Sequence, residues 1–168
     1  MISPTCKVIK KFDDSATLER ILREMKSYKA RVGFLVGSGI HDEKSNLPTA
    51  TIAAYNEFGT PNARHPTPAR PFLRPVFRDT AMQKAEMRKL MPGTIFAKDG
   101  IRLRKSPRTK LFFELYAMSM RTKVQAMIRS NIPPENAEWT KEQKGLNKTQ
   151  TLIDTDAMLQ AVSYEVIQ

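Results

Sequence analysis

The sequence predicts an α+β fold, in which a small, mostly antiparallel sheet packs against one long central helix with additional short helices around it. Residues 109–130 carry the longest helical pattern, and short apolar segments at 31–37 and 162–166 have the character of strands. A proline-rich arm at 60–75 is the third observation. Because 168 residues, 40% of them hydrophobic, suffice for one core, we expect a single domain spanning 1–168.

The N-terminal third predicts a helix followed by a strand. Between Ser15 and Lys29 the apolar residues recur at helical spacing, at Leu18, Ile21, Leu22 and Met25. The strand at 31–37 is short and apolar, and Gly37-Ser38-Gly39 closes it. The polar loop at 40–47 is expected to be mobile.

The middle of the chain predicts two helices separated by the arm. Pro48 suits a first helical turn, and the helix that follows should end at Phe58, before Gly59. The arm holds five prolines, at positions 61, 66, 68, 71 and 75, and should be extended and semi-rigid. Residues 76–90 are expected to be helical, and Asp99-Gly100 predicts a hairpin between 94–97 and 101–103.

The C-terminal third contains the predicted central helix, at 109–130, which Asn131-Ile132-Pro133-Pro134 should end. The polar segment at 133–149 is expected to be mobile and outside the core. Asp154 or Thr155 can cap a short helix that ends near Leu159. The alternating residues 162–166 then predict the last strand.

Composition favours an acidic partner and argues against a metal protein. The formal charge is +11 with a pI near 10.0, which fits nucleic acid, an acidic neighbouring subunit or a merely solvated basic surface. Basic clusters lie at 64–78 and 102–108 without a recognised nucleic-acid motif, so any DNA contact should be nonspecific. One cysteine and two histidines cannot complete a Cys/His zinc site. No apolar run approaches the roughly 20 residues of a membrane span.

The motifs of common catalytic sites do not occur in the sequence. There is no glycine-rich phosphate loop, no helix with paired histidines and no Gly-x-Ser-x-Gly. Two oxygen-rich groups, at 41–43 and 154–156, could hold a cation, but a solvated loop and a helix cap explain them better. We therefore expect no enzymatic activity and no cofactor.

Two segments carry a family resemblance. Residues 52–60 read Ile-Ala-Ala-Tyr-Asn-Glu-Phe-Gly-Thr, and 68–75 read Pro-Ala-Arg-Pro-Phe-Leu-Arg-Pro. Together they resemble the hallmark of tailed-bacteriophage minor tail and virion-morphogenesis proteins, which complete tails or join heads to tails. Residues 148–166 are similar to the closing segment of that family, Thr-Leu-Ile-Asp-Thr followed by a short helix and a strand. The family usually has glycine after Asp-Thr, where this chain has Asp156.

The resemblance implies a structural protein of the neck or upper tail of the virion, present in the host cytoplasm during assembly. It implies an oligomeric ring and contacts with tail-tube, tail-terminator, connector or neck proteins. A ring requires heterologous contacts that close on themselves. The alternative is a nonspecific DNA-binding accessory protein, which the charge favours.

The motif residues have expected roles of their own. Gly59 should end a helix, Pro71 should stiffen the arm, and Phe58 and Phe72 should be core anchors. Glu57 and Arg70 have opposite charges on either side of the bend, which suggests an ion pair, or alternatively Arg70 or Arg74 reaches a neighbouring subunit. The assembly interface is expected to contain four arginines, namely Arg64, Arg70, Arg74 and Arg78.

The composition generates a first prediction, that folding requires no metal ion. Adding a chelator should leave the melting temperature of the purified chain unchanged, because the sequence supplies no dense set of ligands. Differential scanning calorimetry with and without EDTA measures this, and a large drop on chelation would contradict it.

Overall fold

The computed structural model describes residues 15–35, 37, 39–42, 47–97, 102–144, 150–153 and 156–168. Its fold is α+β, as predicted. In chain order the elements are α1 (Ser15–Ser27), β1 (Lys29–Gly33), β2 (Ile40–Asp42), β3 (Leu47–Pro48), α2 (Thr49–Phe58), α3 (Arg74–Arg78), α4 (Thr80–Thr94), α5 (Thr109–Arg129), α6 (Glu138–Lys144), α7 (Ala157–Ala161) and β4 (Ser163–Ile167).

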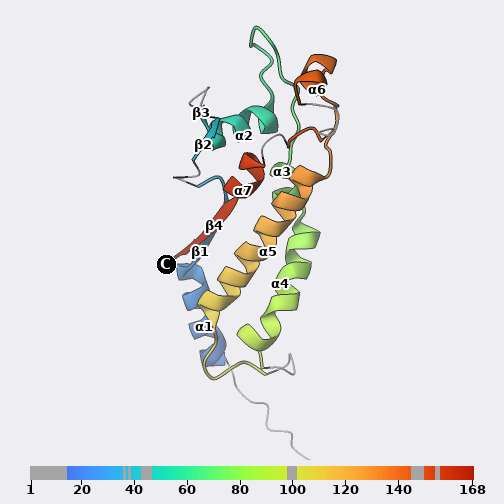
Figure 1. Cartoon of the computed structure of the whole chain (residues 1–168). Coiled ribbons are helices and arrows are strands. Elements are labelled where there is room, and N and C mark those ends of the chain that lie inside the picture. The colour runs from blue at the N-terminus through green and yellow to red at the C-terminus, as the bar shows by residue number, and fades with distance from the viewer. Residues whose placement is uncertain are drawn as a thin grey trace, which may run out of the picture.

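Helix α5 is the centre of the fold, which confirms the predicted central helix. It lies alongside α4 and contacts β1 and β4 as well (Figure 1). Its buried side chains recur at intervals of three to five residues along one face, at Phe112, Ala117, Met120, Val124 and Ile128. An apolar stripe of this kind is stable only when other elements cover it, so α5 organises the packing of its neighbours.

The main sheet has two antiparallel strands that lie far apart in the sequence. Strand β1 pairs with β4, with Ala30 opposite Val166 and Val32 opposite Tyr164. The first strand was predicted at 31–37, but it starts at Lys29 and ends at Gly33, whose φ of 145° breaks the extended path. Phe34 then packs edge-on against Phe72, with ring centroids 6.0 Å apart. The small pairing of β2 with β3 was not predicted.

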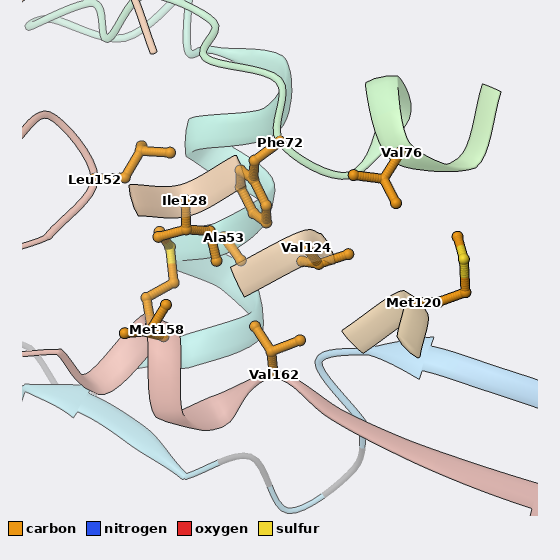
Figure 2. Close-up of a cluster of buried hydrophobic side chains, with 10 residues drawn as sticks. Ala53, Phe72, Val76, Met120, Val124, Ile128, Leu152, Met158 and Val162 are labelled. Atoms are coloured by element: carbon orange, nitrogen blue, oxygen red, sulfur yellow. The ribbon is translucent and has the colours of Figure 1, made fainter. Parts of the chain in front are cut away.

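The larger hydrophobic core joins α2, the arm, α3, α5 and α7. Figure 2 shows Phe72 from the arm, Val124 and Ile128 from α5 and Met158 from α7 gathered near Ala53 of α2. Phe72, Val124 and Ile128 are fully buried. A smaller cluster of Ile21, Ile95 and Phe112 fastens α1 and the end of α4 to α5. Phe72 is therefore a core anchor, as expected.

Phe58 was also expected to be a core anchor, and this prediction was wrong. Its side chain is 65% exposed. Ala53 and Glu57 are the residues of α2 that turn inward at this end of the helix, so the neighbouring position 58 faces away from the core.

Two predictions for residues 76–103, a helix and a hairpin, needed correction. The helix expected at 76–90 is two helices, α3 and α4, separated at Asp79, whose carboxylate accepts a hydrogen bond from the Met82 amide. Of the predicted hairpin, the described residues form one antiparallel bridge, between Phe96 and Leu103. The turn predicted at Asp99-Gly100 lies outside the described residues.

Part of the polar segment at 133–149 is folded and one of its residues is buried, which corrects the expectation that it lies outside the core. Residues 138–144 form α6, and Asn136 is buried. The short C-terminal helix is α7, and β4 follows it one residue later than predicted. Asp154 and Thr155, the predicted caps, lie outside the described residues, as do 43–46 and 145–149. Within the described residues, no helix is long and apolar enough to cross a membrane.

The core generates a second prediction. Phe72→Ala should lower the free energy of unfolding by about 3 to 5 kcal/mol, because it empties a fully buried site. Phe58→Ala removes the same atoms from an exposed position and should cost no more than about 1 kcal/mol. Urea denaturation of both variants measures the difference, and equal losses would contradict the assignment.

Candidate functional site

The candidate site is built around the carboxylate of Glu57, at the last turn of α2. Glu57 is 2% exposed. Its Oε2 accepts hydrogen bonds from the amides of Phe72 and Leu73, at 2.8 and 2.9 Å. Its Oε1 accepts from the amide and from Nε of Arg74, at 3.0 and 2.9 Å. We call Glu57 with residues 72–74 the Glu57 clamp, because it ties the end of α2 to the start of α3.

The ion pair predicted between Glu57 and Arg70 is not formed, because the partner of Glu57 is Arg74. The Arg74 side chain also donates from Nη2 to the backbone oxygen of Glu57, at 2.6 Å. Arg70 is turned the other way and is 5% exposed. Its Nε donates to the Pro134 carbonyl at 2.8 Å, and its Nη2 donates to the Glu135 carbonyl at 3.0 Å. Arg70 therefore holds the arm to the segment that follows α5.

The clamp controls the ionisation of its carboxylate. Burial by itself raises the pKa of Glu57, but the hydrogen bonds from the amides of Leu73, Phe72 and Arg74 and from the Arg74 side chain together lower it below its usual value. Burial lowers the pKa of the Arg70 guanidinium. Glu57 and Arg70 are both charged at neutral pH. The clamp therefore contains a buried carboxylate that is ionised.

The arm forms a loop whose two ends are hydrogen-bonded to each other, whereas the sequence predicted an extended path. The amide of Thr60 donates to the Thr67 carbonyl at 2.9 Å, and the Thr67 amide donates to Oγ1 of Thr60 at 2.9 Å. Gly59 has a φ of 75°, and a Cβ there would lie 2.9 Å from backbone atoms of Thr67 and Ala69. Only glycine fits this position. Residues 61–66 are exposed beyond this closure and project from the end of the molecule (Figure 1).

Three exposed aromatic side chains lie on the two helices that the clamp joins, Tyr55 and Phe58 on α2 and Phe77 on α3. Tyr55, Phe58 and Phe77 are 44%, 65% and 41% exposed. The guanidinium of Arg74 lies over the Phe58 ring, 5.1 Å from its centroid. We call Tyr55, Phe58, Arg74, Phe77 and Arg78 the aromatic-arginine surface. Tyr55 and Phe77 were not predicted as site residues, although Tyr55 stands three residues before Phe58 and so shares its helix face.

The four arginines of the predicted interface differ in their surroundings. Arg64 and Arg78 are exposed, on the loop and on α3. Arg74 is half-buried and bonded to Glu57, and Arg70 is buried. Only Arg64 and Arg78 can meet a partner with the whole side chain. Pro71 is half-buried between Arg70 and Phe72.

The described residues hold no group of three or more His, Cys, Asp or Glu side chains that could bind a metal ion. Comparison of the chain with protein-family models, curated proteins and solved structures found no match.

The clamp generates a third prediction, on pH dependence. Glu57→Gln should lower the free energy of unfolding at pH 7 by about 3 kcal/mol, because an uncharged amide cannot accept from all four donors. The folded-state pKa of Glu57 is lowered, so its stabilisation is complete above the unfolded value near 4.5 and is lost as the pH falls through the folded pKa. The gap between wild type and variant should therefore shrink below pH 4.5 in urea titrations.

Glu86 is the matched control for this titration. Its pKa is lowered to about 2 by hydrogen bonds from Lys89 and Ser119 and by the nearby Lys123. Glu86→Gln should also give a gap that shrinks in acid, but a smaller one at pH 7, because Lys89 is an exposed partner. A Glu57→Gln gap that stays constant from pH 7 to pH 3 would show that the carboxylate charge is not what the clamp uses.

Proposed function

We propose that this chain is a structural protein of a tailed-bacteriophage virion, acting at the neck or upper tail, where it completes the tail or joins it to the head. The observation that carries the proposal is the Glu57 clamp. The residues of the family-like segment, Glu57, Gly59, Phe72 and Arg74, support one another physically and form one unit.

The closing segment supplies a second support. Position 156, where the resembling family has glycine, has a φ of 59° in this chain. That left-handed conformation is the one glycine adopts without strain, and aspartate is among the few other residues that tolerate it. The departure at Asp156 therefore preserves the backbone that a glycine would favour.

The aromatic-arginine surface is chemically suited to a protein contact. Aromatic and arginine side chains are enriched in the cores of protein interfaces, where they combine large apolar area with directed hydrogen bonds. Arg78 gives this surface an exposed positive charge, and Arg64 is exposed on the loop at 61–66. A partner surface with apolar and acidic side chains would match, on a second copy in a ring or on a tail-tube, tail-terminator, connector or neck protein.

A DNA-binding accessory role is the second candidate, and the formal charge of +11 favours it. Exposed basic residues also occur at Arg102, Lys105 and Arg108, away from the clamp. The two candidates differ in their salt dependence. The test measures the affinity of the isolated chain for duplex DNA at salt concentrations from about 50 to about 200 mM. A steep fall in affinity over this range, in which salt screens contacts to phosphate, would favour the DNA role.

The fourth prediction tests the assembly role. Replacing Arg64 and Arg78 with Ala should leave stability within about 0.5 kcal/mol of wild type, because both side chains are exposed. In the phage or prophage that encodes the chain, the double variant should yield unjoined heads and tails, counted by negative-stain electron microscopy. Arg74 is excluded from the test, because its loss would also break the Glu57 clamp.

The matched control is the double variant Arg23→Ala and Arg129→Ala. It removes the same charge from exposed positions on α1 and α5 and should assemble normally. Normal joining by the Arg64 and Arg78 variant, or equal loss in both double variants, would contradict a specific role for these two arginines. Labelling the subunit in the particle would give its position directly.

A further inference from the structure

The sheet formed by β1 and β4 has two open edges within the described part of the chain. It contains these two strands alone, since β2 and β3 pair with each other in a separate sheet. Each strand uses one edge for the ladder, so the backbone N–H and C=O groups of its other edge point away from the partner strand. Apart from the pairing of β1 with β4, no backbone hydrogen bond joins the described residues of either strand to another described segment. Edges of this kind are templates for a further strand.

The two strands carry opposite charges on one face of the sheet. Val32 packs against the hydrophobic core, so Lys29 and Arg31 lie on the opposite face of β1. Glu165 of β4 stands opposite Arg31 and accepts a hydrogen bond from its guanidinium at 3.0 Å, although both side chains are partly exposed. Lys29 is exposed as well. Strand β1 is therefore the basic edge of the sheet, and β4, whose one charged side chain is Glu165, is the acidic edge.

These charges favour one way of joining two copies of the chain. Pairing β1 with β1 would bring Lys29 and Arg31 near the same residues of a second copy, and pairing β4 with β4 would bring two Glu165 carboxylates together. Pairing β4 of one copy with β1 of the next places opposite charges together instead. The faces of a sheet stay aligned only when the register changes by two residues, so Glu165 meets Lys29 or Arg31 of the next copy in the registers that pair most of both strands.

We propose that copies of this chain associate head to tail, with β4 of one copy paired to β1 of the next. Strands β1 and β4 are antiparallel within a copy, so a rotation about an axis along the strands makes each new pair antiparallel as well. The contact is heterologous, and closure into a ring removes both open edges of every copy. Helix α5 packs against both strands and moves with the sheet as one unit (Figure 1). The ring rests on the proposed function, whereas the strand pairing rests on the sheet edges.

Charge reversal on each edge tests this contact in the purified chain. Glu165→Lys makes both edges basic, and the double variant Lys29→Glu with Arg31→Glu makes both edges acidic. Native mass spectrometry over a concentration series should show wild-type assemblies of more than two copies. Each variant alone should need a concentration about tenfold or more higher to assemble, because like charges then face each other across the contact.

An equimolar mixture of the two variants separates the contact between copies from the ion pair within a copy. Both variants lose the pair of Arg31 with Glu165 inside the chain, and mixing does not restore it. Mixing does restore opposite charges between copies, so the mixture should assemble at the wild-type concentration and contain both variants in equal numbers. A wild type that stays monomeric or stops at a dimer, or a mixture that assembles no better than its components, would overturn the inference.

Cross-linking gives a second readout that keeps Arg31 and Glu165 in place. In chains that also carry Cys6→Ser, Lys29→Cys is mixed with Ile167→Cys and treated with a short bismaleimide. Positions 29 and 167 lie on β1 and β4, so products that join 29 to 167 should exceed their statistical share over those that join 29 to 29 or 167 to 167. Arg23→Cys mixed with Arg129→Cys, at exposed positions on α1 and α5, should give the statistical ratio.

The statistical ratio for positions 29 and 167 would assign their products to random collision and overturn the strand pairing. The outcome for the proposed function is separate, because both measurements use the purified chain alone. A chain that pairs in this way but has no part in joining heads to tails would contradict the proposed function and leave the strand pairing standing.

Discussion

The carboxylate of Glu57 links the end of α2 to the residues that lead into α3. It sits at the end of α2 and accepts hydrogen bonds from the first residues of the next helical segment, fifteen to seventeen positions later. A carboxylate with 2% exposure would destabilise the fold if it were unpaired. Three amides and a guanidinium donate hydrogen bonds to the Glu57 carboxylate. They fix the position of residues 72–74, because any shift would leave a buried charge without its donors.

The hydrogen bonds of Glu57 position both the neighbouring hydrophobic core and the loop at 61–66. Phe72 donates its amide to Glu57 and buries its ring among α2, α5 and α7, so the polar clamp and the apolar core share a residue. The other consequence is at Gly59, where the chain leaves α2 so close to Thr67 and Ala69 that no Cβ fits. The loop at 61–66 therefore projects from a rigid base although it has no helix or strand of its own.

Arg70 and Arg74 of the arm interact with different groups. Arg74 neutralises Glu57 and also lies over Phe58, which connects the interior of the clamp to its exposed aromatic face. Arg70 turns inward, donates to the backbone carbonyls of Pro134 and Glu135, and is among the residues that line a cavity. The chain has a formal charge of +11, and these two arginines place positive charge beside an exposed aromatic ring and in the wall of a cavity.

The amino-acid sequence determined the features that depend on local patterns. The spacing of apolar residues located α5, Gly59 ended α2, and Phe72 was recognised as a core residue. Tertiary structure alone decided which arginine meets Glu57, because Arg70 and Arg74 are both near in sequence and only the direction of the chain into α3 distinguishes them. It also turned Phe58 outward, paired β1 with β4 across more than a hundred residues, and gathered Arg70, Lys144 and Met158 around one cavity. These are contacts between distant segments, and a pattern of period two or 3.6 carries no information about which segments will meet.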